Sequence, residues 1–238
     1  IAEFAGAAIM AINFMWRYGY EWKTAVCYGV FHSIAAFCNA GFGLEDDNLI
    51  QYQADPVVNL TIIFQVILGG IGFPVILDWH RQRHHPFLDR WNHLLLHSKL
   101  MLVGTASLLT LGTMAFLILE WDGALAEMSF PQKLMASLFQ STTPRTAGFN
   151  TVDYAKLTDA TLLVTILLML IGAGPCSTGG GFKVSTFTIL VCRAWSTFHG
   201  FRRVHVFRRT LAQQVIERAV ATALLFSVVA GVGLVLLL

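Results

Sequence analysis

The sequence predicts an all-α membrane protein built from repeated units, each made of a membrane span, a re-entrant half-helix and a second span. Two observations lead to this fold class: long uncharged apolar blocks, and a short signature that occurs twice. Of the 238 residues, 55% are hydrophobic and only 13% are charged, against roughly 25% charged in an average soluble domain. Because soluble helices need a polar face, a large soluble helical core is the weaker interpretation.

Four apolar blocks indicate where the chain crosses a membrane. Val57–Leu77, Leu100–Leu119 and Ala219–Leu238 contain no formal charge, and Ala160–Cys176 is a shorter block of the same kind. Their lengths match the about 17–25 residues that a helix needs to cross the hydrocarbon core. Ile1 and Leu238 both lie inside apolar segments, so we expect the chain to be the middle of a longer polypeptide.

The repeated signature is Phe-x-Ser followed by Ala-Gly-Phe, at Phe31–Phe42 and at Phe139–Phe149. Each copy follows a short apolar stretch of helix length and precedes a long apolar span. Glycine permits backbone dihedrals that other residues resist, and rings of backbone carbonyls replace the hydration shell of a cation in ion filters. Either glycine alone would fit a plain tight turn, but two matching turns at membrane depth indicate a cation pathway.

The elements follow in order from these anchors. Residues 1–16 end a span, Trp22–Phe37 is a half-helix, Cys38–Phe42 an extended turn, Val57–Trp79 a span and His80–Ser98 a cytoplasmic connection. Lys99–Glu120 is the next span, Pro131–Thr143 the second half-helix and Pro144–Phe149 its extended turn; Thr158–Phe198 is an interrupted span, Gly200–Gln214 a second cytoplasmic connection and Val215–Leu238 a final span. The units are therefore expected at 1–80 and 99–199, joined by 81–98, with 200–238 beginning another unit.

Charge indicates the orientation. Ten of the 16 basic residues lie in or beside the two connections: Arg81, Arg83, Arg90, Lys99, Arg193, Arg202, Arg203, Arg208, Arg209 and Arg218. The positive-inside bias makes both connections cytoplasmic. Acids surround the two signatures on the other side: Glu21, Glu45, Asp46, Asp47, Asp55, Glu120, Asp122, Glu127, Asp153 and Asp159. An acidic mouth attracts cations, although a solvated outer surface explains these acids equally well.

Three segments give the chain a specific resemblance: Phe31–Leu44, Gln140–Thr151 and Ile171–Thr186. In these segments the chain resembles the membrane subunit of the Trk/Ktr/HKT superfamily of potassium transporters, and the order and spacing agree over essentially the whole chain. Val204–Arg209 looks closer to the Ktr side. The resemblance implies four span–pore-helix–span repeats around one pore, of which this chain would hold most of the second, all of the third and the start of the fourth.

The resemblance also implies the function and its residues. We expect potassium uptake across the plasma (inner) membrane by a multi-pass protein that is not an enzyme and has no covalent cofactor, with K⁺ as the permeant ion. The expected filter residues are Cys38, Asn39, Ala40, Gly41, Phe42, Arg145, Thr146, Ala147, Gly148 and Phe149, and K⁺ would bind the backbone carbonyls of Asn39, Gly41, Thr146 and Gly148. A sodium-permeable member is the alternative. Pro144 and Phe182 depart from the pattern common among the members of that superfamily. We expect these departures to affect the tuning of transport and not transport itself.

The span after the second signature carries an insertion. In the first repeat Leu68–Val75 is expected to continue as one span. The equivalent stretch of the second repeat, from Gly172 to Gly181, is six residues longer. Proline and glycine cannot continue a helix there, and the resemblance implies an intramembrane gating loop of Gly174, Pro175, Cys176, Ser177, Thr178, Gly179, Gly180, Gly181 and Lys183. A structural kink is the alternative. A phosphate-binding loop fails on spacing, because Phe182 separates Gly181 from Lys183.

The remaining candidates are weighed in the same way. Arg145 is expected to turn away from the ion path and to pair with an acid or with backbone carbonyls, and Asn39 to brace its turn. The five histidines from His80 to His97 are expected to be interfacial, since no zinc-type cluster accompanies them. The four cysteines are expected to be small buried side chains. An intramembrane enzyme would need facing catalytic groups, which the uncharged blocks lack.

The basic connections are the expected partner surface. Arg202–Arg209 would contact anionic lipid head groups or a partner protein. The resemblance implies that this partner is a cytosolic nucleotide-binding regulatory subunit, docked on His80–Ser98 and Gly200–Gln214, and that the protein is a homodimer. No nucleic-acid partner is expected.

Overall fold

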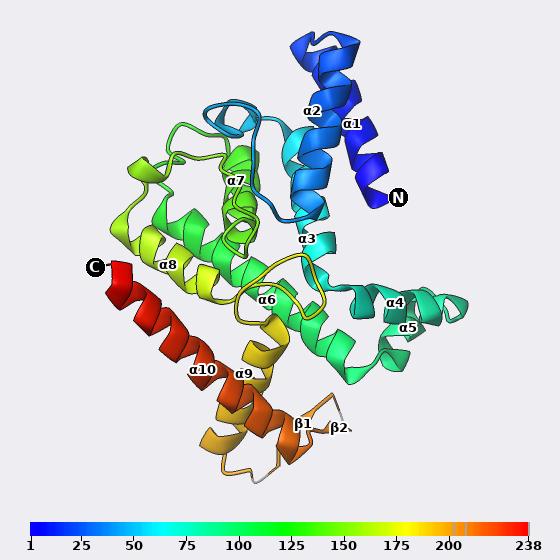
Figure 1. The fold of residues 1–238 in the computed structure, drawn as a ribbon, viewed down its shortest axis with the longest axis vertical. Coiled ribbons are helices and arrows are strands. Elements are labelled where there is room, and N and C mark those ends of the chain that lie inside the picture. The colour runs from blue at the N-terminus through cyan, green and yellow to red at the C-terminus, as the bar shows by residue number, and fades with distance from the viewer. Residues whose placement is uncertain (202, 208, 238) are drawn as a thin grey trace.

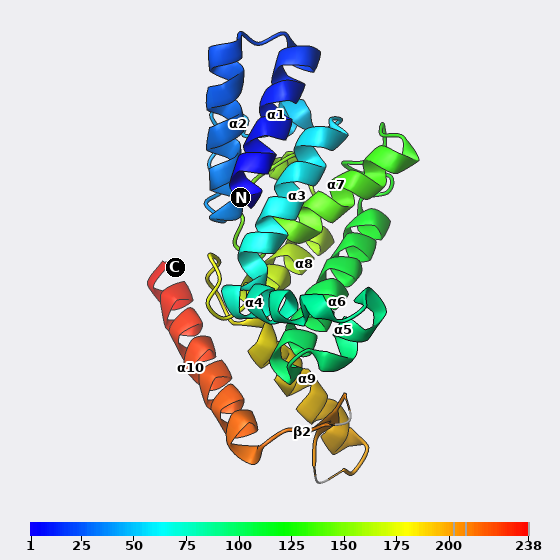
Figure 2. The same cartoon turned by 90° about the vertical axis from the view of Figure 1, so that its right-hand side faces the viewer.

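The computed structural model describes residues 1–201, 203–207 and 209–237, and this part of the chain is mainly helical (Figures 1 and 2). The helices are α1 (Ala2–Tyr18), α2 (Trp22–Phe37), α3 (Pro56–Ile71), α4 (Phe73–Arg81), α5 (Phe87–His93), α6 (Leu96–Leu119), α7 (Phe130–Thr142), α8 (Asp159–Leu170), α9 (Val184–Phe198) and α10 (Gln213–Leu237). Short 3-10 turns lie at Ile50–Tyr52, Gln82–His84 and Tyr154–Lys156, and β1 (His205–Val206) pairs antiparallel with β2 (Arg209–Thr210).

The predicted all-α fold class is confirmed, and the order of elements repeats as expected. A helix, a half-helix and a further helix occur as α1–α2–α3 and again as α6–α7–α8. The second half-helix begins with a capping box between Ser129 and Gln132, and α3 begins at Asp55, whose carboxylate accepts hydrogen bonds from the first backbone amides of the helix. Such caps satisfy amides that a helix start leaves free. The division into units at residues 80, 98 and 199 stays a prediction.

In the part of the chain that the structure describes, two helices are long and apolar enough to cross a membrane, Leu96–Leu119 and Gln213–Gly233, and a third crossing results if the bent pair α3–α4 is counted as one. The helix α8 is apolar but shorter. Large apolar side chains on these helices face outward, among them Ile118 at 70% and Leu225 at 67% exposure. A continuous apolar exterior of this kind is unusual for a soluble monomer and is typical of a membrane protein.

The basic connections lie below the other two connections in both views. In Figures 1 and 2 the α4–α5 segment lies near mid-height and the β1–β2 hairpin at the lower end, while the α1–α2 and α6–α7 connections lie higher. This order agrees with the positive-inside bias if the lower side is cytoplasmic.

The first repeat differs from the sequence prediction. Val57–Trp79 is not one continuous helix, because the chain bends by 90° between α3 and α4. Gly72 has a φ of 94°, and Pro74 has no N–H to donate to the carbonyl of Gly70. The backbone amide of Gly174 donates to that carbonyl instead, at 2.8 Å. The helix breaks here without any insertion.

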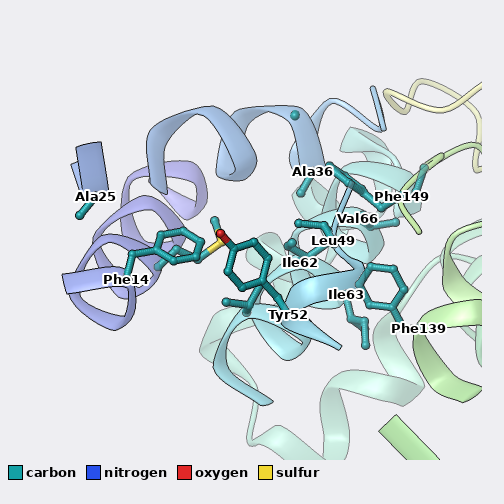
Figure 3. Packing of buried hydrophobic residues seen from close by; sticks show 14 residues of the cluster. Phe14, Ala25, Ala36, Leu49, Tyr52, Ile62, Ile63, Val66, Phe139 and Phe149 are labelled. Carbon is teal, nitrogen blue, oxygen red and sulfur yellow. The ribbon is translucent and has the colours of Figure 1, made fainter. Parts of the chain in front are cut away.

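A core of aromatic and aliphatic side chains joins the first repeat to the second half-helix. Figure 3 shows Phe14 and Tyr52 beside Ile62, Ile63 and Val66 of α3, with Phe139 of α7 and Phe149 completing the cluster. Phe139, Phe149 and Tyr52 are almost fully buried. Aromatic side chains of this size contribute much of the packing energy of a core, so the second signature is held by residues of the first repeat.

The serine of each signature has the same role. The Ser33 hydroxyl donates to the carbonyl of Glu3 at 2.7 Å, and the Ser141 hydroxyl donates to the carbonyl of Leu109 at 2.9 Å. Each serine also touches a glycine of the preceding helix, Gly6 or Gly112, at a position where an added Cβ would collide with the serine oxygen. Small residues allow close approach of helices in membranes, so Phe-x-Ser fixes each half-helix against the helix before it.

The prediction that the cysteines are buried is wrong for three of the four. Cys27, Cys38 and Cys176 are exposed, and Cys192 is half-buried. Cys38 and Cys176 lie on the first turn and on the inserted loop, where the backbone faces away from the helical core.

Candidate functional site

The structure brings the two predicted filter turns together. A Cβ added to Gly41 would lie 2.5 Å from the carbonyl oxygen of Ala147 and 2.7 Å from the Cα of Gly148. Real Cβ atoms do not approach backbone atoms so closely, so only glycine fits at position 41. Gly148 is exposed, and a Cβ added to it would lie 3.2 Å from the Cα of Gly41.

The turns share an unusual backbone conformation. Asn39 and Gly41 have φ values of 52° and 71°, and the equivalent Thr146 and Gly148 have 75° and 79°. The alanine between each pair does not have a positive φ. When right-handed and left-handed backbone conformations alternate, successive peptide groups point to the same side. A row of carbonyl ligands requires this arrangement. A positive φ is rare and strained for a β-branched residue such as Thr146, and strain of this kind clusters at functional sites.

Asn48 connects the two turns, although no sequence pattern singles it out. Its Nδ2 donates to the carbonyl of Gly41 at 3.1 Å, and its Oδ1 accepts from the backbone amide of Asn150 at 3.2 Å. One of the four carbonyls predicted to bind K⁺ is therefore engaged by a side chain. Within the described part of the chain, the other three, those of Asn39, Thr146 and Gly148, accept no hydrogen bond.

The second turn is anchored to its half-helix. The Thr143 hydroxyl donates to the carbonyl of Phe149 at 2.6 Å, and the Thr143 carbonyl accepts from the backbone amides of Ala147 and Gly148. With Phe149 in the core, both ends of this turn are fixed. The first turn is also bonded to its half-helix, since the backbone amides of Asn39 and Ala40 donate to the carbonyls of Ala36 and Ala35, and Asn48 and the inserted loop support it further.

Arg145 does not make the pairing expected from the sequence. Its side chain is buried at 7% exposure and lies beside Val66, Gly70 and Thr105 in a narrow space. Its Nε has no hydrogen-bond partner, and no acid forms an ion pair with it, among the residues that the structure describes. The reason is that mostly apolar residues of α3, the inserted loop and α9 surround it, among them Val66, Ala173 and Val184. That Arg145 turns away from the ion path stays a prediction.

The predicted gating loop is closed at its base and docked on the broken helix. The backbone amide of Gly172 donates to the carbonyl of Phe182 at 2.9 Å, where Ile171 and Phe182 form a parallel bridge. The amide of Phe73 then donates to the carbonyl of Cys176 at 3.1 Å. Together with the Gly174–Gly70 bond, this contact supplies partners that the break in α3–α4 would otherwise leave free.

The loop also lies against both turns. A Cβ added to Gly179 would collide with the Thr146 hydroxyl and lie 3.1 Å from the Nδ2 of Asn39. The Lys183 Nζ donates to the carbonyl of Gly179 at 2.8 Å, so its charge is held on the loop at the start of α9. The Asn39 Oδ1 and the Thr146 Oγ1 are buried and have no partner among the described residues.

The cytoplasmic candidates are only partly described. Arg203 and Arg209 are exposed, and Arg202 and Arg208 lie outside the described residues. The hairpin between them is anchored by Val204 and Leu211, which are buried against α6, α9 and α10. The rings of His85 and His93 stack at 3.8 Å, and no group of three or more metal-binding side chains occurs in the described part.

Comparison with known proteins gives a consistent result. The family model described as TrkH, cation transport protein, matches residues 1–238. The chain is 40% identical over 234 residues to the Ktr system potassium uptake protein B of Bacillus subtilis, covering 97% of this chain and 51% of that protein. It is 35% identical over 223 residues to the potassium/sodium uptake protein NtpJ of Enterococcus hirae, covering 92% of this chain and 47% of that protein. The chain thus spans about half the length of the curated relatives it matches.

A solved structure has the same fold. The crystal structure of the potassium transporter TrkH from Vibrio parahaemolyticus superposes with a TM-score of 0.69 over 92% of this chain and 45% of that one, at 19% identity. At this identity the likeness concerns the fold alone.

Proposed function

This chain belongs to the TrkH family of cation transport proteins, and from that premise we propose that the protein mediates potassium uptake through a filter that includes Gly41 and Gly148. The family is one of transporters, in agreement with the prediction that the chain is not an enzyme. The observation that carries the proposal is the direct contact of two turns from different repeats, each with a positive φ at equivalent residues.

The filter is proposed to use the unpaired carbonyls of Asn39, Thr146 and Gly148, with the Gly41 carbonyl shared between Asn48 and the ion. A carbonyl has two lone pairs, so one hydrogen bond does not prevent a second contact. Asn48 then sets the distance between the turns, and Thr143 fixes the second turn to α7.

The loop from Gly174 to Gly181 is proposed to be the gate. The loop lies against both turns, and most of its own residues are small. Non-helical backbone at membrane depth is tolerated only where protein or a water-filled cavity surrounds it. A gate needs two conformations of similar free energy. A loop that is held to a broken helix by a few hydrogen bonds reaches a second conformation more readily than a continuous helix does.

The proposal includes a membrane setting and a partner. The protein is proposed to be a multi-pass component of the plasma membrane that works as a homodimer with a cytosolic nucleotide-binding subunit. The support is the position of both basic connections below the α1–α2 and α6–α7 connections in Figures 1 and 2 and the similarity to a Ktr system protein.

Sodium permeation is the second candidate. It is favoured by the 35% identity to a protein named as a potassium/sodium uptake protein. Glycine at both filter positions favours potassium, because a side chain at either position would disturb the carbonyl row.

Substitution of the two glycines tests the filter. Gly41→Ser and Gly148→Ser are each expected to lower the preference for potassium over sodium by about tenfold, the equivalent of the 1–2 kcal/mol that a left-handed conformation costs a residue with a side chain. Uptake of both cations is measured in cells that lack their own potassium uptake. Gly231→Ser on α10 is the control, because nothing lies within 4 Å of its Cβ position. Unchanged uptake of both cations in the two filter variants would overturn the proposal.

A further inference from the structure

One hydroxyl group links the inserted loop to the first filter turn. The Thr178 Oγ1 donates to the carbonyl of Phe37 at 2.9 Å and accepts from the Nδ2 of Asn39 at 3.2 Å. Phe37 is the last residue of α2, and Asn39 is the first residue of the turn with a positive φ. The last carbonyls of a helix have no partner within the helix, so Thr178 completes the end of the half-helix from another repeat.

The backbone of Thr178 is fixed at the same place. Its amide donates to the carbonyl of Gly69 at 3.2 Å, on the last turn of α3. Gly69 is required there, because an added Cβ would collide with the carbonyl of Phe37 and lie 2.8 Å from the Thr178 hydroxyl. A single residue of the loop thus holds the end of α2, the start of the turn and the end of α3.

The other side chains of the loop bond within it. The Ser177 hydroxyl donates to the carbonyls of Gly174 and Gly179, and Lys183 donates to Gly179. In the part of the chain that the structure describes, Thr178 is the loop residue whose side chain bonds to the first turn. The second turn has no equivalent bond there, since the Thr146 hydroxyl faces Gly179 without a partner.

We propose that Thr178 is a positioning residue that couples the gate to the filter. While the loop is docked, the Thr178 hydroxyl bonds to the Phe37 carbonyl and to the side-chain amide of Asn39. These bonds fix Asn39 in its left-handed conformation. When the loop moves away, both groups lose this partner in the same step and the first turn relaxes. The inference rests on the proposed function and adds to it that gate opening and ion preference are linked through this residue.

The test uses Thr178→Val, which has nearly the same shape but no hydroxyl, and Thr178→Ser, which keeps the hydroxyl. Ser177→Ala is the matched variant, because it removes a hydroxyl that bonds only within the loop. Two quantities are measured in the complete protein: the ratio of potassium to sodium uptake, and the rate at which a thiol reagent modifies Cys176. Cys176 is exposed on the loop. The other three cysteines are replaced by serine only for the modification experiment, and the uptake ratio is measured with all four cysteines in place, because Cys38 lies on the first turn.

Thr178→Val is expected to raise the rate of Cys176 modification about fivefold, as expected for the net loss of one hydrogen bond, and to lower the potassium preference. Thr178→Ser should restore both quantities, and Ser177→Ala should leave the preference as in the parent. The double variant Asn39→Ala/Thr178→Val should resemble the stronger single variant, because residues that act through one contact are not additive.

The outcomes separate the two proposals. A parent that takes up neither cation overturns the proposed function and this inference with it. A selective parent whose Thr178→Val variant is modified faster at Cys176 but keeps the full potassium preference overturns the coupling alone. Additive effects of Asn39→Ala and Thr178→Val also overturn it, because the two residues would then act separately.

Discussion

At the scale of the residue, the clearest regularity is the equivalence of Ser33 and Ser141. Each donates its hydroxyl to a carbonyl of the preceding helix, at Glu3 and Leu109, and each touches a glycine three residues further along that helix. The two contacts occur in separate repeats with the same spacing. These bonds fix each half-helix along the helix that it packs against, and they therefore help to set the height of the turn that follows.

The first prediction concerns these serines. Ser33→Ala and Ser141→Ala should each lower the free energy of unfolding by about 1 kcal/mol, since an interhelical hydrogen bond contributes roughly this amount. The measurement is the thermal unfolding of the purified protein in detergent. Ser227→Ala is the control, because the Ser227 hydroxyl bonds within its own helix, to Ala223 on the exposed α10. A loss no greater than that of Ser227→Ala would show that these bonds do not hold the half-helices.

The sequence identified the residues of the turns because their pattern is local. Gly41 and Gly148 are visible from matching flanks, and the structure places them in contact. Asn48 and Thr178 are not visible in this way, because Asn48 acts on Asn150 and Thr178 on Phe37, residues far away in the sequence. Polar residues in loops that bond across repeats leave no periodicity to detect.

At the scale of the element, the two repeats break their last helix by different means. The second repeat has an insertion, which a comparison of lengths reveals. The first has only Gly72 and Pro74, and the prediction of a continuous span there was wrong because a glycine and a proline within an apolar block also occur in intact membrane helices. The two breaks lie against each other, because the backbone amides of Gly174 and Thr178 donate to the carbonyls of Gly70 and Gly69.

Removal of the loop is the prediction at this scale. Deleting Pro175–Gly180 should raise ion flux and weaken its dependence on a regulatory subunit, because the segment that lies against both turns is gone. The potassium preference should fall but not disappear, since Thr143 and Phe149 still hold the second turn. Flux is measured in vesicles that contain equal amounts of folded protein. A deletion variant that folds and inserts normally yet conducts no more than the parent would identify the loop as a structural kink.

At the scale of the whole molecule, charge and topology agree. The fold class, the order of elements and the common side of the basic connections follow from apolar blocks and charge distribution alone, because these depend on the membrane and not on detailed packing. The packing between repeats could not be predicted: Phe14 and Tyr52 belong to the same core cluster as Phe139 and Phe149, which lie more than eighty residues away in sequence. The filter turns depend on that core, so their exact contact was also beyond the sequence.

The last prediction concerns the basic surface at the β1–β2 hairpin. Arg203 and Arg209 are exposed beside a hairpin that Val204 and Leu211 anchor to the helices, which is the arrangement of a rigid basic surface. Replacing Arg202, Arg203, Arg208 and Arg209 by Gln should weaken co-purification with the proposed regulatory subunit, most clearly at low salt, because exposed charges are screened over about 8–10 Å at physiological ionic strength. Lys156→Gln is the control, since Lys156 is an exposed basic residue outside both basic connections. The folded fraction of the quadruple variant should equal that of the parent, because the anchoring side chains are unchanged. Co-purification as strong as that of the parent would exclude this surface as the docking site and leave the α4–α5 connection, with Arg81 and Arg83, as the remaining one.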